Sequence, residues 1–216
     1  MAYDHEEQEQ MASLKAWWNQ YGNLLTWALT IVLAGYAAWT GWNYYQRTQS
    51  TEASMLYNEL QNAVKAKDAT KIQRAATDLQ DRYVRTPYAQ MSALVAAKSA
   101  IDASDLPRAK AQLQWVIDKG ADAEYKAIAR IRLAGILLDE KAYDAGLALL
   151  ATDFPVEFAV DVADRKGDLL VAQNKLVEAR SAYQLALDKA EQKNPGRQLI
   201  QLKLDAIGGA VAKAAA

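Results

Sequence analysis

Residues 103–113, Ala-Ser-Asp-Leu-Pro-Arg-Ala-Lys-Ala-Gln-Leu, contain the pattern that decides the fold. A short polar turn precedes Leu106, a small residue follows three positions later at Ala109, and a large apolar residue follows four positions after that at Leu113. Spacings of three and four place these side chains on one face of a helix. The segment therefore predicts the second helix of a helical hairpin that packs through a small residue.

The same pattern occurs four times along the chain. The other copies are Ile72–Ala75–Leu79, Tyr143–Gly146–Leu150 and Leu176–Ala179–Tyr183. The small residues are 34, 37 and 33 positions apart, which is close to the period of tetratricopeptide repeats. A generic helical bundle would also show helical spacing, but four near-periodic copies favour the repeat. We expect the small residue of each copy to lie where two antiparallel helices cross; these repeat-packing residues are Ala75, Ala109, Gly146 and Ala179.

The segments around these copies complete the hairpins. A second small residue lies twelve positions before each crossing, at Ala63, Ala97, Ala134 and Gly167. Short polar turns separate the paired helices at residues 67–69, 103–105, 139–141 and 173–175. Prolines, which end or begin helices, lie near repeat boundaries at Pro87, Pro155 and Pro195. The last segment, residues 196–211, is predicted to be a helix that caps the final repeat.

The composition excludes much of enzyme chemistry. The 216 residues include no cysteine and one histidine, His5, so thiolate nucleophiles, cysteine-ligated metals and histidine-based triads cannot form in the body of the chain. The sequence also lacks a phosphate-binding glycine loop and a basic face interleaved with aromatic residues. We therefore expect no enzymatic activity, no metal or other cofactor and no nucleic-acid partner.

The N-terminal part of the chain predicts a membrane anchor. No charged residue occurs between Lys15 and Arg47, and residues 24–45 would span roughly 33 Å as a helix, enough for a bilayer core of about 30 Å. Aromatic residues mark both ends of this stretch, as expected at the two membrane interfaces. They are Trp17, Trp18, Tyr21, Trp39, Trp42, Tyr44 and Tyr45. A buried core helix would rarely carry its aromatics at both ends.

A cleaved signal peptide is the competing interpretation of this stretch. Its N-terminal region should be basic, whereas residues 1–16 contain four acidic residues and Lys15 as the only base. We therefore divide the chain into an acidic tail at residues 1–16, an uncleaved anchor at residues 17–46 and a repeat domain at residues 47–216. Basic residues flank the anchor almost equally, so the charge distribution leaves the orientation open.

Two surfaces are candidate interaction sites. Small residues form one stripe on the anchor and would let another helix approach closely, or simply face lipid. They are Thr26, Thr30, Ala34, Ala37, Ala38 and Gly41. In the repeats, mostly apolar residues of the first helices are expected to face a concave groove that suits a partner helix or an unfolded segment, unless neighbouring helices cover them. They are Tyr57, Leu60, Val64, Met91, Leu94, Lys98, Ile101, Ile128, Ile131, Gly135 and Leu138.

The fourth repeat differs from the others at the equivalent positions. It places Asp161, Asp164 and Asp168 there, which would give the groove an acidic end. The run Asp164-Arg165-Lys166 also fits a solvated helix face.

The order of these parts resembles a known family. An acidic tail, Trp17-Trp18, one membrane helix that ends in residues 41–45 (Gly-Trp-Asn-Tyr-Tyr) and helical repeats follow one another. Residues 88–94 (Tyr-Ala-Gln-Met-Ser-Ala-Leu), 130–134 (Arg-Ile-Arg-Leu-Ala) and 178–183 (Glu-Ala-Arg-Ser-Ala-Tyr) strengthen the match. Its most specific piece is residues 164–168, Asp-Arg-Lys-Gly-Asp. Over nearly all 216 residues, the chain resembles the YfgM family of ancillary subunits of the bacterial SecYEG translocon.

This resemblance implies an all-α protein with a single N-terminal transmembrane helix, a tetratricopeptide-like solenoid of about four hairpins and a capping helix. It implies an inner-membrane protein with a cytoplasmic N-terminus and periplasmic repeats. The implied partners are the SecYEG translocon, the periplasmic chaperone PpiD and unfolded client proteins in transit, and a link to Rcs envelope-stress signalling is also implied. A scaffold of another envelope complex and a regulator that faces the cytoplasm remain alternatives.

Overall fold

The computed structural model describes residues 3–209 and consists of helices and turns over that range, without a strand. The predicted all-α class is therefore confirmed. The start of the predicted tail at residues 1–2, and the ends of the predicted capping helix and repeat domain beyond residue 209, lie outside the described residues. The chain divides into two units, Met1–Thr51 and Glu52–Ala216.

Helix α1 (Tyr3–Lys65) contributes to both units. In the first unit it carries the apolar stretch, and it contains a window long and apolar enough to cross a membrane. No residue of that window is buried, and Leu24, Trp27 and Ile31 are each about two-thirds exposed. A core helix of a soluble domain would be covered by neighbouring elements, so that alternative does not fit this segment.

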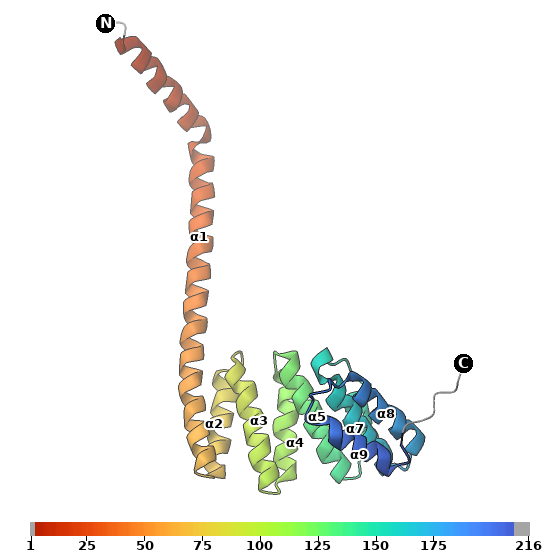
Figure 1. The fold of residues 1–216 in the computed structure, drawn as a ribbon. Coiled ribbons are helices and arrows are strands. Elements are labelled where there is room, and N and C mark those ends of the chain that lie inside the picture. The colour runs from red at the N-terminus through yellow and green to blue at the C-terminus, as the bar shows by residue number, and fades with distance from the viewer. Residues whose placement is uncertain (1–2, 210–216) are drawn as a thin grey trace, which may run out of the picture. The chain divides into compact units, whose positions relative to one another are not determined.

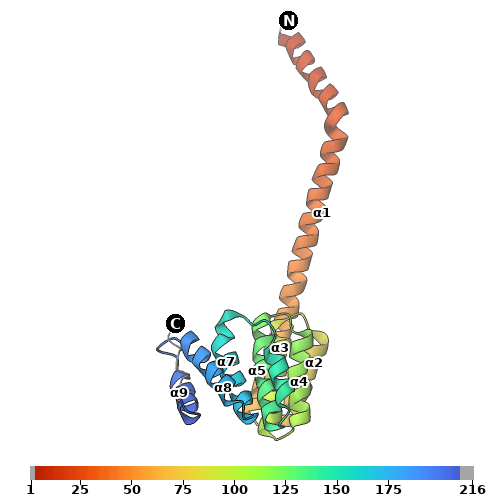
Figure 2. The same ribbon diagram turned by 90° about the vertical axis from the view of Figure 1, so that its right-hand side faces the viewer.

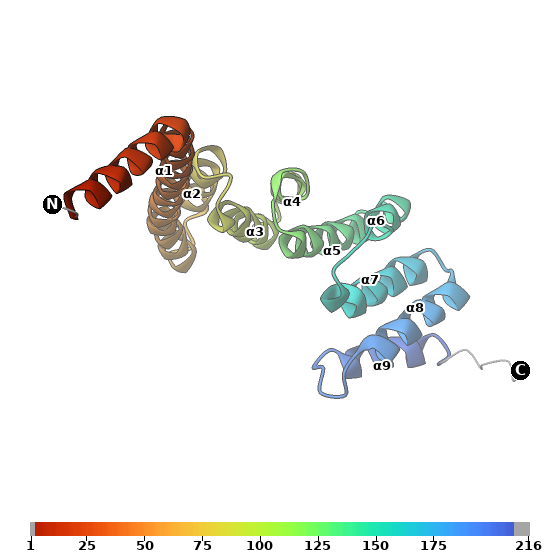
Figure 3. The same ribbon diagram turned by 90° about the horizontal axis from the view of Figure 1, so that it is seen from above.

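The second unit consists of the last turns of α1 and eight further helices among the described residues. Consecutive helices of this unit pack against one another (Figure 1). Seen from above, they follow one another along a path that turns after α6 (Figure 3). They are α2 (Ala69–Arg82), α3 (Pro87–Asp102), α4 (Leu106–Lys119), α5 (Ala123–Asp139), α6 (Tyr143–Leu150), α7 (Ala159–Ala172), α8 (Leu176–Lys189) and α9 (Arg197–Ala206), with a 3₁₀ turn η1 (Val156–Phe158) before α7.

The four turns inside the hairpins share one backbone geometry. Each contains a non-glycine residue with a positive φ of 54–62°: Lys67, Ser104, Lys141 and Asn174. Around Lys141, the amide of that residue donates to the carbonyl of Leu138, and the next amide, Ala142, donates to Leu137. The same two bonds close the other three turns, which is the Schellman arrangement for ending a helix. The predicted turns are therefore confirmed, and their geometry repeats with the sequence pattern.

The prolines mark helix boundaries, as the sequence predicts. Pro87 is the first residue of α3, Pro155 directly precedes η1, and Pro195 lies between α8 and α9. Proline fits these positions because it has no amide hydrogen to donate within a helix.

The core of the repeats forms between paired and successive helices. The small residues Ala75, Ala109, Gly146 and Ala179 are all buried. At Gly146, an added Cβ would lie 2.9 Å from a methyl carbon of Leu169, so the Leu169 side chain would have to shift to accept any larger residue between α6 and α7. The residues twelve positions earlier are buried as well: Ala63, Ala97, Ala134 and Gly167. The hairpins therefore pack through their small side chains.

Candidate functional site

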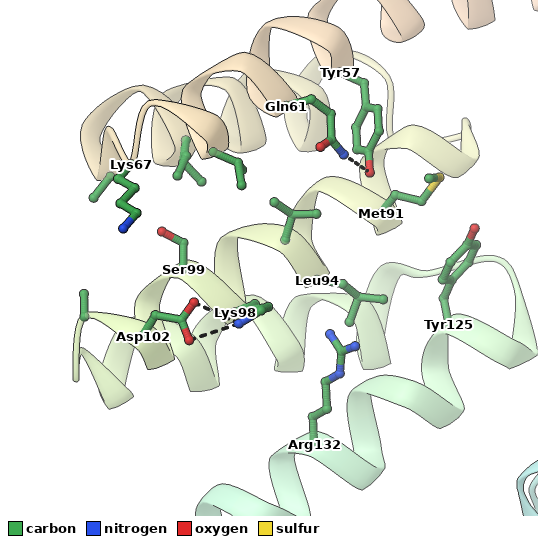
Figure 4. A pocket seen from close by; sticks show the side chains of 15 residues that line it. Tyr57, Gln61, Lys67, Met91, Leu94, Lys98, Ser99, Asp102, Tyr125 and Arg132 are labelled. Carbon is green, nitrogen blue, oxygen red and sulfur yellow. Dashed lines mark hydrogen bonds and ion pairs between the residues drawn. The ribbon is translucent and has the colours of Figure 1, made fainter. Parts of the chain in front are cut away.

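A groove of about 750 Å³ opens between the last turns of α1, the face of α3 and the first part of α5. In Figure 4, Met91 and Leu94 of α3 lie between Tyr57 and Gln61 of α1 on one side and Tyr125 and Arg132 of α5 on the other. These three helices are the first helices of successive hairpins. The groove therefore lies on the surface that the repeat geometry makes concave.

The groove has an apolar floor and a polar rim. Met91, Leu94 and Val95 of α3 form its floor. The side-chain amide of Gln61 donates to the Tyr57 hydroxyl at 2.9 Å, and the Tyr57 ring packs against Tyr88 with centroids 5.5 Å apart. These contacts fix the position of the Tyr57 ring at the side of the groove.

Cationic side chains predominate on the rim. Lys98 forms an ion pair with Asp102 at 2.9 Å, while Lys67 and Arg132 have no ion pair among the described residues. Among the described residues, Asp102 is the only carboxylate that lines the groove. The rim therefore favours a ligand that combines apolar side chains with negative charge.

Five of the eleven predicted groove residues line this groove: Tyr57, Val64, Met91, Leu94 and Lys98. Leu60 was expected to face the groove, but it is completely buried. It belongs to the core cluster that α1 forms with α2, so its expected place is wrong. Ile101 is 36% exposed and does not line the groove.

The four predicted residues of α5 also lie elsewhere. Ile128 packs against the core between α3, α4 and α5, while Ile131 and Leu138 pack against the core between α5, α6 and α7. Gly135 lies against the guanidinium of Arg165 from α7. The residues of α5 that do line the groove are Tyr125 and Arg132. The face of α5 that lines the groove thus differs from the predicted face by a rotation of roughly 100° about the helix axis, which corresponds to about one residue.

Sequence reasoning missed ten residues that line the groove. They are Gln61, Lys67, Ala69, Ile72, Val95, Ser99, Asp102, Ala103, Tyr125 and Arg132. A signal for two of them was present, since Tyr125 and Arg132 are seven positions apart and so lie on one helix face. Their polar ends are equally typical of a solvent-facing helix surface, so this spacing alone does not identify a groove.

The expected acidic end of the groove is a paired cluster instead. The Lys203 ammonium of α9 lies 2.8 Å from carboxylate oxygens of both Asp164 and Asp168 of α7. Asp168 also accepts a hydrogen bond of 2.9 Å from the Tyr183 hydroxyl and pairs with Arg165 at 3.3 Å. We call these five residues the α9 clamp. Asp164 and Asp168 are thus paired within the clamp, whereas Asp161, the third residue of the expected acidic end, is exposed and lies outside it.

The clamp changes the acidity of its members. Burial raises the pKa of the Asp164 carboxyl, and the nearby charge of Asp168 raises it further, while the hydrogen bond from Lys203 opposes both. Burial also raises the pKa of the Tyr183 phenol well above 10, supported by the charge of Asp168. A tyrosine with this environment stays neutral and keeps donating to Asp168. The clamp therefore links α9 to α7 and α8 through ion pairs and a hydrogen bond.

The small-residue stripe of the anchor is open in this structure. Thr26, Thr30, Ala34, Ala37, Ala38 and Gly41 are all exposed. A Cβ added at Gly41 would meet no atom within 4 Å. Thr30 donates its hydroxyl to the carbonyl of Thr26 at 2.8 Å, which satisfies that polar group inside the helix. The stripe can therefore face lipid or another helix without an unsatisfied hydroxyl at Thr30.

Within the part of the chain that the structure describes, no group of three or more histidine, cysteine, aspartate or glutamate side chains could hold a metal ion. In the α9 clamp, Lys203 already occupies the space between the two carboxylates. The groove and the stripe, unlike the clamp, are open to solvent in this structure.

Comparisons with known proteins match nearly the whole chain. The family model of the tetratricopeptide repeat-like domain matches residues 15–209. A protein of Neisseria gonorrhoeae described as an ancillary SecYEG translocon subunit is 34% identical over 208 residues, which cover 96% of this chain and 100% of that protein. Proteins with the same description from Haemophilus influenzae and Escherichia coli are 27% and 26% identical, over 95% and 92% of this chain and 99% and 95% of their own lengths. No solved structure matches the chain.

Proposed function

Because this chain belongs to the family of ancillary SecYEG translocon subunits, with a tetratricopeptide repeat-like domain, we propose that it is a non-enzymatic tether in the inner membrane. Its anchor would hold it beside the translocon, and its repeats would hold a chaperone or a newly translocated protein nearby. The observation that carries this proposal is the 34% identity over the full length of a protein named for that complex. Confinement to the membrane raises the local concentration of partners without requiring tight contacts.

The anchor would contact the translocon through its small-residue stripe. Transmembrane helices associate by close packing, which small side chains permit, and the stripe has no partner within the described residues. Ala28 lies on the opposite face of the helix, because its position is rotated by about 160° from Thr30. It therefore offers a matched position outside the stripe.

Site-specific photocrosslinking in native membranes tests this contact. A photoreactive amino acid at Thr30 should crosslink to a translocon subunit, and the same group at Ala28 should crosslink mainly to lipid. Equal translocon crosslinking from both positions would contradict docking through the stripe. No translocon crosslink from either position would contradict docking through the anchor.

The groove would bind an apolar segment of a partner. Its apolar floor suits hydrophobic side chains, and its cationic rim suits flanking acidic residues. The periplasmic chaperone PpiD and unfolded clients that leave the translocon are the partners we propose. A newly translocated segment exposes apolar side chains until it folds or aggregates. A binding site next to the translocon exit would reach the segment before it aggregates.

Two valines allow a matched test of the groove. Val64 lines it and is 36% exposed, whereas Val84 lies outside it, between α2 and α3, and is 38% exposed. Val64→Glu should reduce crosslinking of the repeat domain to PpiD or to an arrested secretory protein. Val84→Glu places the same charge at a similarly exposed site, but outside the groove. It should therefore leave the crosslinking unchanged. Equal loss in both variants would point to unfolding, and no loss in Val64→Glu would contradict the groove.

This function requires a cytoplasmic N-terminus and periplasmic repeats. Protease added to spheroplasts should then digest the repeat domain while the membrane stays intact. Full protection would place the repeats in the cytoplasm and contradict the proposed chaperone partner.

The Rcs envelope-stress pathway would respond when unfolded proteins accumulate in the absence of the tether.

A further inference from the structure

The first part of α1 changes direction before the apolar stretch begins (Figures 1 and 2). This part of the sequence contains Gly22, which lies buried under the indole of Trp18. The Thr26 hydroxyl donates to the Gly22 carbonyl at 2.7 Å. Glycine within a helix and a threonine that bonds back to a carbonyl four residues earlier both favour a bend.

The segment before this bend has one apolar face. Its large side chains recur at helical spacing and are 42–69% exposed. They are Met11, Leu14, Trp17, Trp18 and Tyr21. The other side of the segment carries Ser13, Ala16, Asn19 and Gln20. Nothing among the described residues covers the apolar face, and such a surface is normally buried against a partner or a membrane.

Length decides where this face can lie. Residues 22–45 form 24 residues of helix, or about 36 Å, which already fills a bilayer core of about 30 Å. Residues 11–21 cannot enter the core in line with them. Their apolar face nevertheless continues directly from the membrane-spanning segment, which brings it to the membrane surface. The bend lets the helix turn there into the plane of the bilayer.

We propose that residues 11–21 form an interfacial helix that inserts this apolar face among the lipid headgroups. The proposal rests on the membrane anchoring set out above and adds a second lipid-binding element to it. Residues 1–16 are acidic overall, so attraction to anionic lipids does not drive the insertion. Burial of the aromatic and aliphatic side chains does, as for other interfacial helices of strong amphipathicity.

The absence of cysteine makes a direct test possible in the full-length chain. Single cysteines for a nitroxide label can be placed on the apolar face, at Leu14→Cys, and on the opposite face, at Ala16→Cys. Ile31→Cys reports on the membrane span itself. Each labelled protein is reconstituted into phosphatidylcholine nanodiscs, where lipid is the only available partner. Collisions with oxygen report lipid exposure, and collisions with a nickel chelate report water exposure.

The proposal expects an oxygen-to-nickel collision ratio at Leu14→Cys that is several-fold higher than at Ala16→Cys. A second pair, Tyr21→Cys and Asn19→Cys, should show the same contrast. Equal, water-like ratios at both pairs, together with a lipid-like ratio at Ile31→Cys, would overturn the interfacial helix and leave the anchor intact. A water-like ratio at Ile31→Cys would overturn both the anchor and the interfacial helix.

Discussion

At the scale of single residues, Gly167 determines how closely α7 and α8 pack. A Cβ at this position would overlap with ring carbons of Tyr183, a buried residue of the α9 clamp. Gly135 is a contrasting case, because a Cβ there would lie 3.5 Å from the nearest atom, the Arg165 guanidinium carbon. The first glycine is required by packing, and the second is not.

Alanine substitutions should separate these two cases. Gly167→Ala should lower the free energy of unfolding by about 1–3 kcal/mol, because the Tyr183 ring must move. Gly135→Ala should leave it unchanged or raise it by up to about 1 kcal/mol, because alanine favours the helix. Urea denaturation of the repeat domain, residues 47–216, measures both. Equal losses would contradict the close contact between Gly167 and Tyr183.

Tyr183 should also make the protein sensitive to alkaline pH. Its pKa in the folded protein is raised above the ordinary value of 10.0, chiefly by burial. The folded state therefore keeps a proton that the unfolded state loses, and stability falls as pH rises above about 10. The contribution is complete below that pH.

Thermal unfolding measured across this range should show a smaller alkaline loss in Tyr183→Phe than in the wild type. Burial and a hydrogen bond to Glu52 also raise the pKa of Tyr83. Tyr83 should therefore account for part of the alkaline loss that remains in Tyr183→Phe. Identical pH profiles in both proteins would show that Tyr183 ionises as freely when folded as when unfolded.

At the scale of elements, the α9 clamp fixes the capping helix to the last hairpin. Ile200 and Leu204 of α9 are buried in a core cluster with Ala163, Tyr183 and Leu187. Lys203, on the same helix, forms ion pairs with two carboxylates of α7. A terminal repeat needs such a cover because its apolar face has no next repeat to pack against.

Removal of the lysine charge should loosen this end of the domain. Lys203→Met leaves Asp164 and Asp168 side by side without their shared cation, at sites about one-fifth exposed, and should cost about 1–3 kcal/mol. Lys110→Met removes the more exposed pair with Glu140 and should cost less than about 1 kcal/mol. Hydrogen exchange should become faster in α9 only in the first variant. Equal protection of α9 in both variants would contradict the clamp.

Local patterns predicted the hairpins well because their signals lie close together in sequence. The spacing of Ala109, Leu106 and Leu113, and the polar turns, are set by contacts within one hairpin. The clamp was not predicted from the sequence, because Asp164 and Lys203 are 39 positions apart. No local spacing connects an acidic residue on one helix with a lysine two helices later.

The groove was predicted less well than the hairpins. Its location on the first helices agrees with five predicted residues, but the rotation of α5 about its axis depends on how α7 packs. Arg165 of α7 occupies the space beside Gly135, so the predicted face of α5 is covered there. Which side of a helix faces a groove is thus a tertiary property.

At the scale of the whole molecule, the chain combines an uncovered apolar helix with a domain of stacked hairpins. The family places it with ancillary subunits of the SecYEG translocon. The proposed tether needs both parts, because the anchor selects the location and the repeats supply a surface for a partner. Loss of either part should abolish the function while leaving the other part folded.

The most direct test is isolation of the tagged full-length protein from native membranes in mild detergent, with quantification of the co-isolated proteins. The wild type and Ala28→Leu should both enrich SecYEG, whereas a variant with Ala34→Leu and Ala37→Leu should lose it, because bulky side chains on the stripe block close helix packing. Absence of SecYEG from the wild-type sample, with a different envelope complex enriched in its place, would contradict the account.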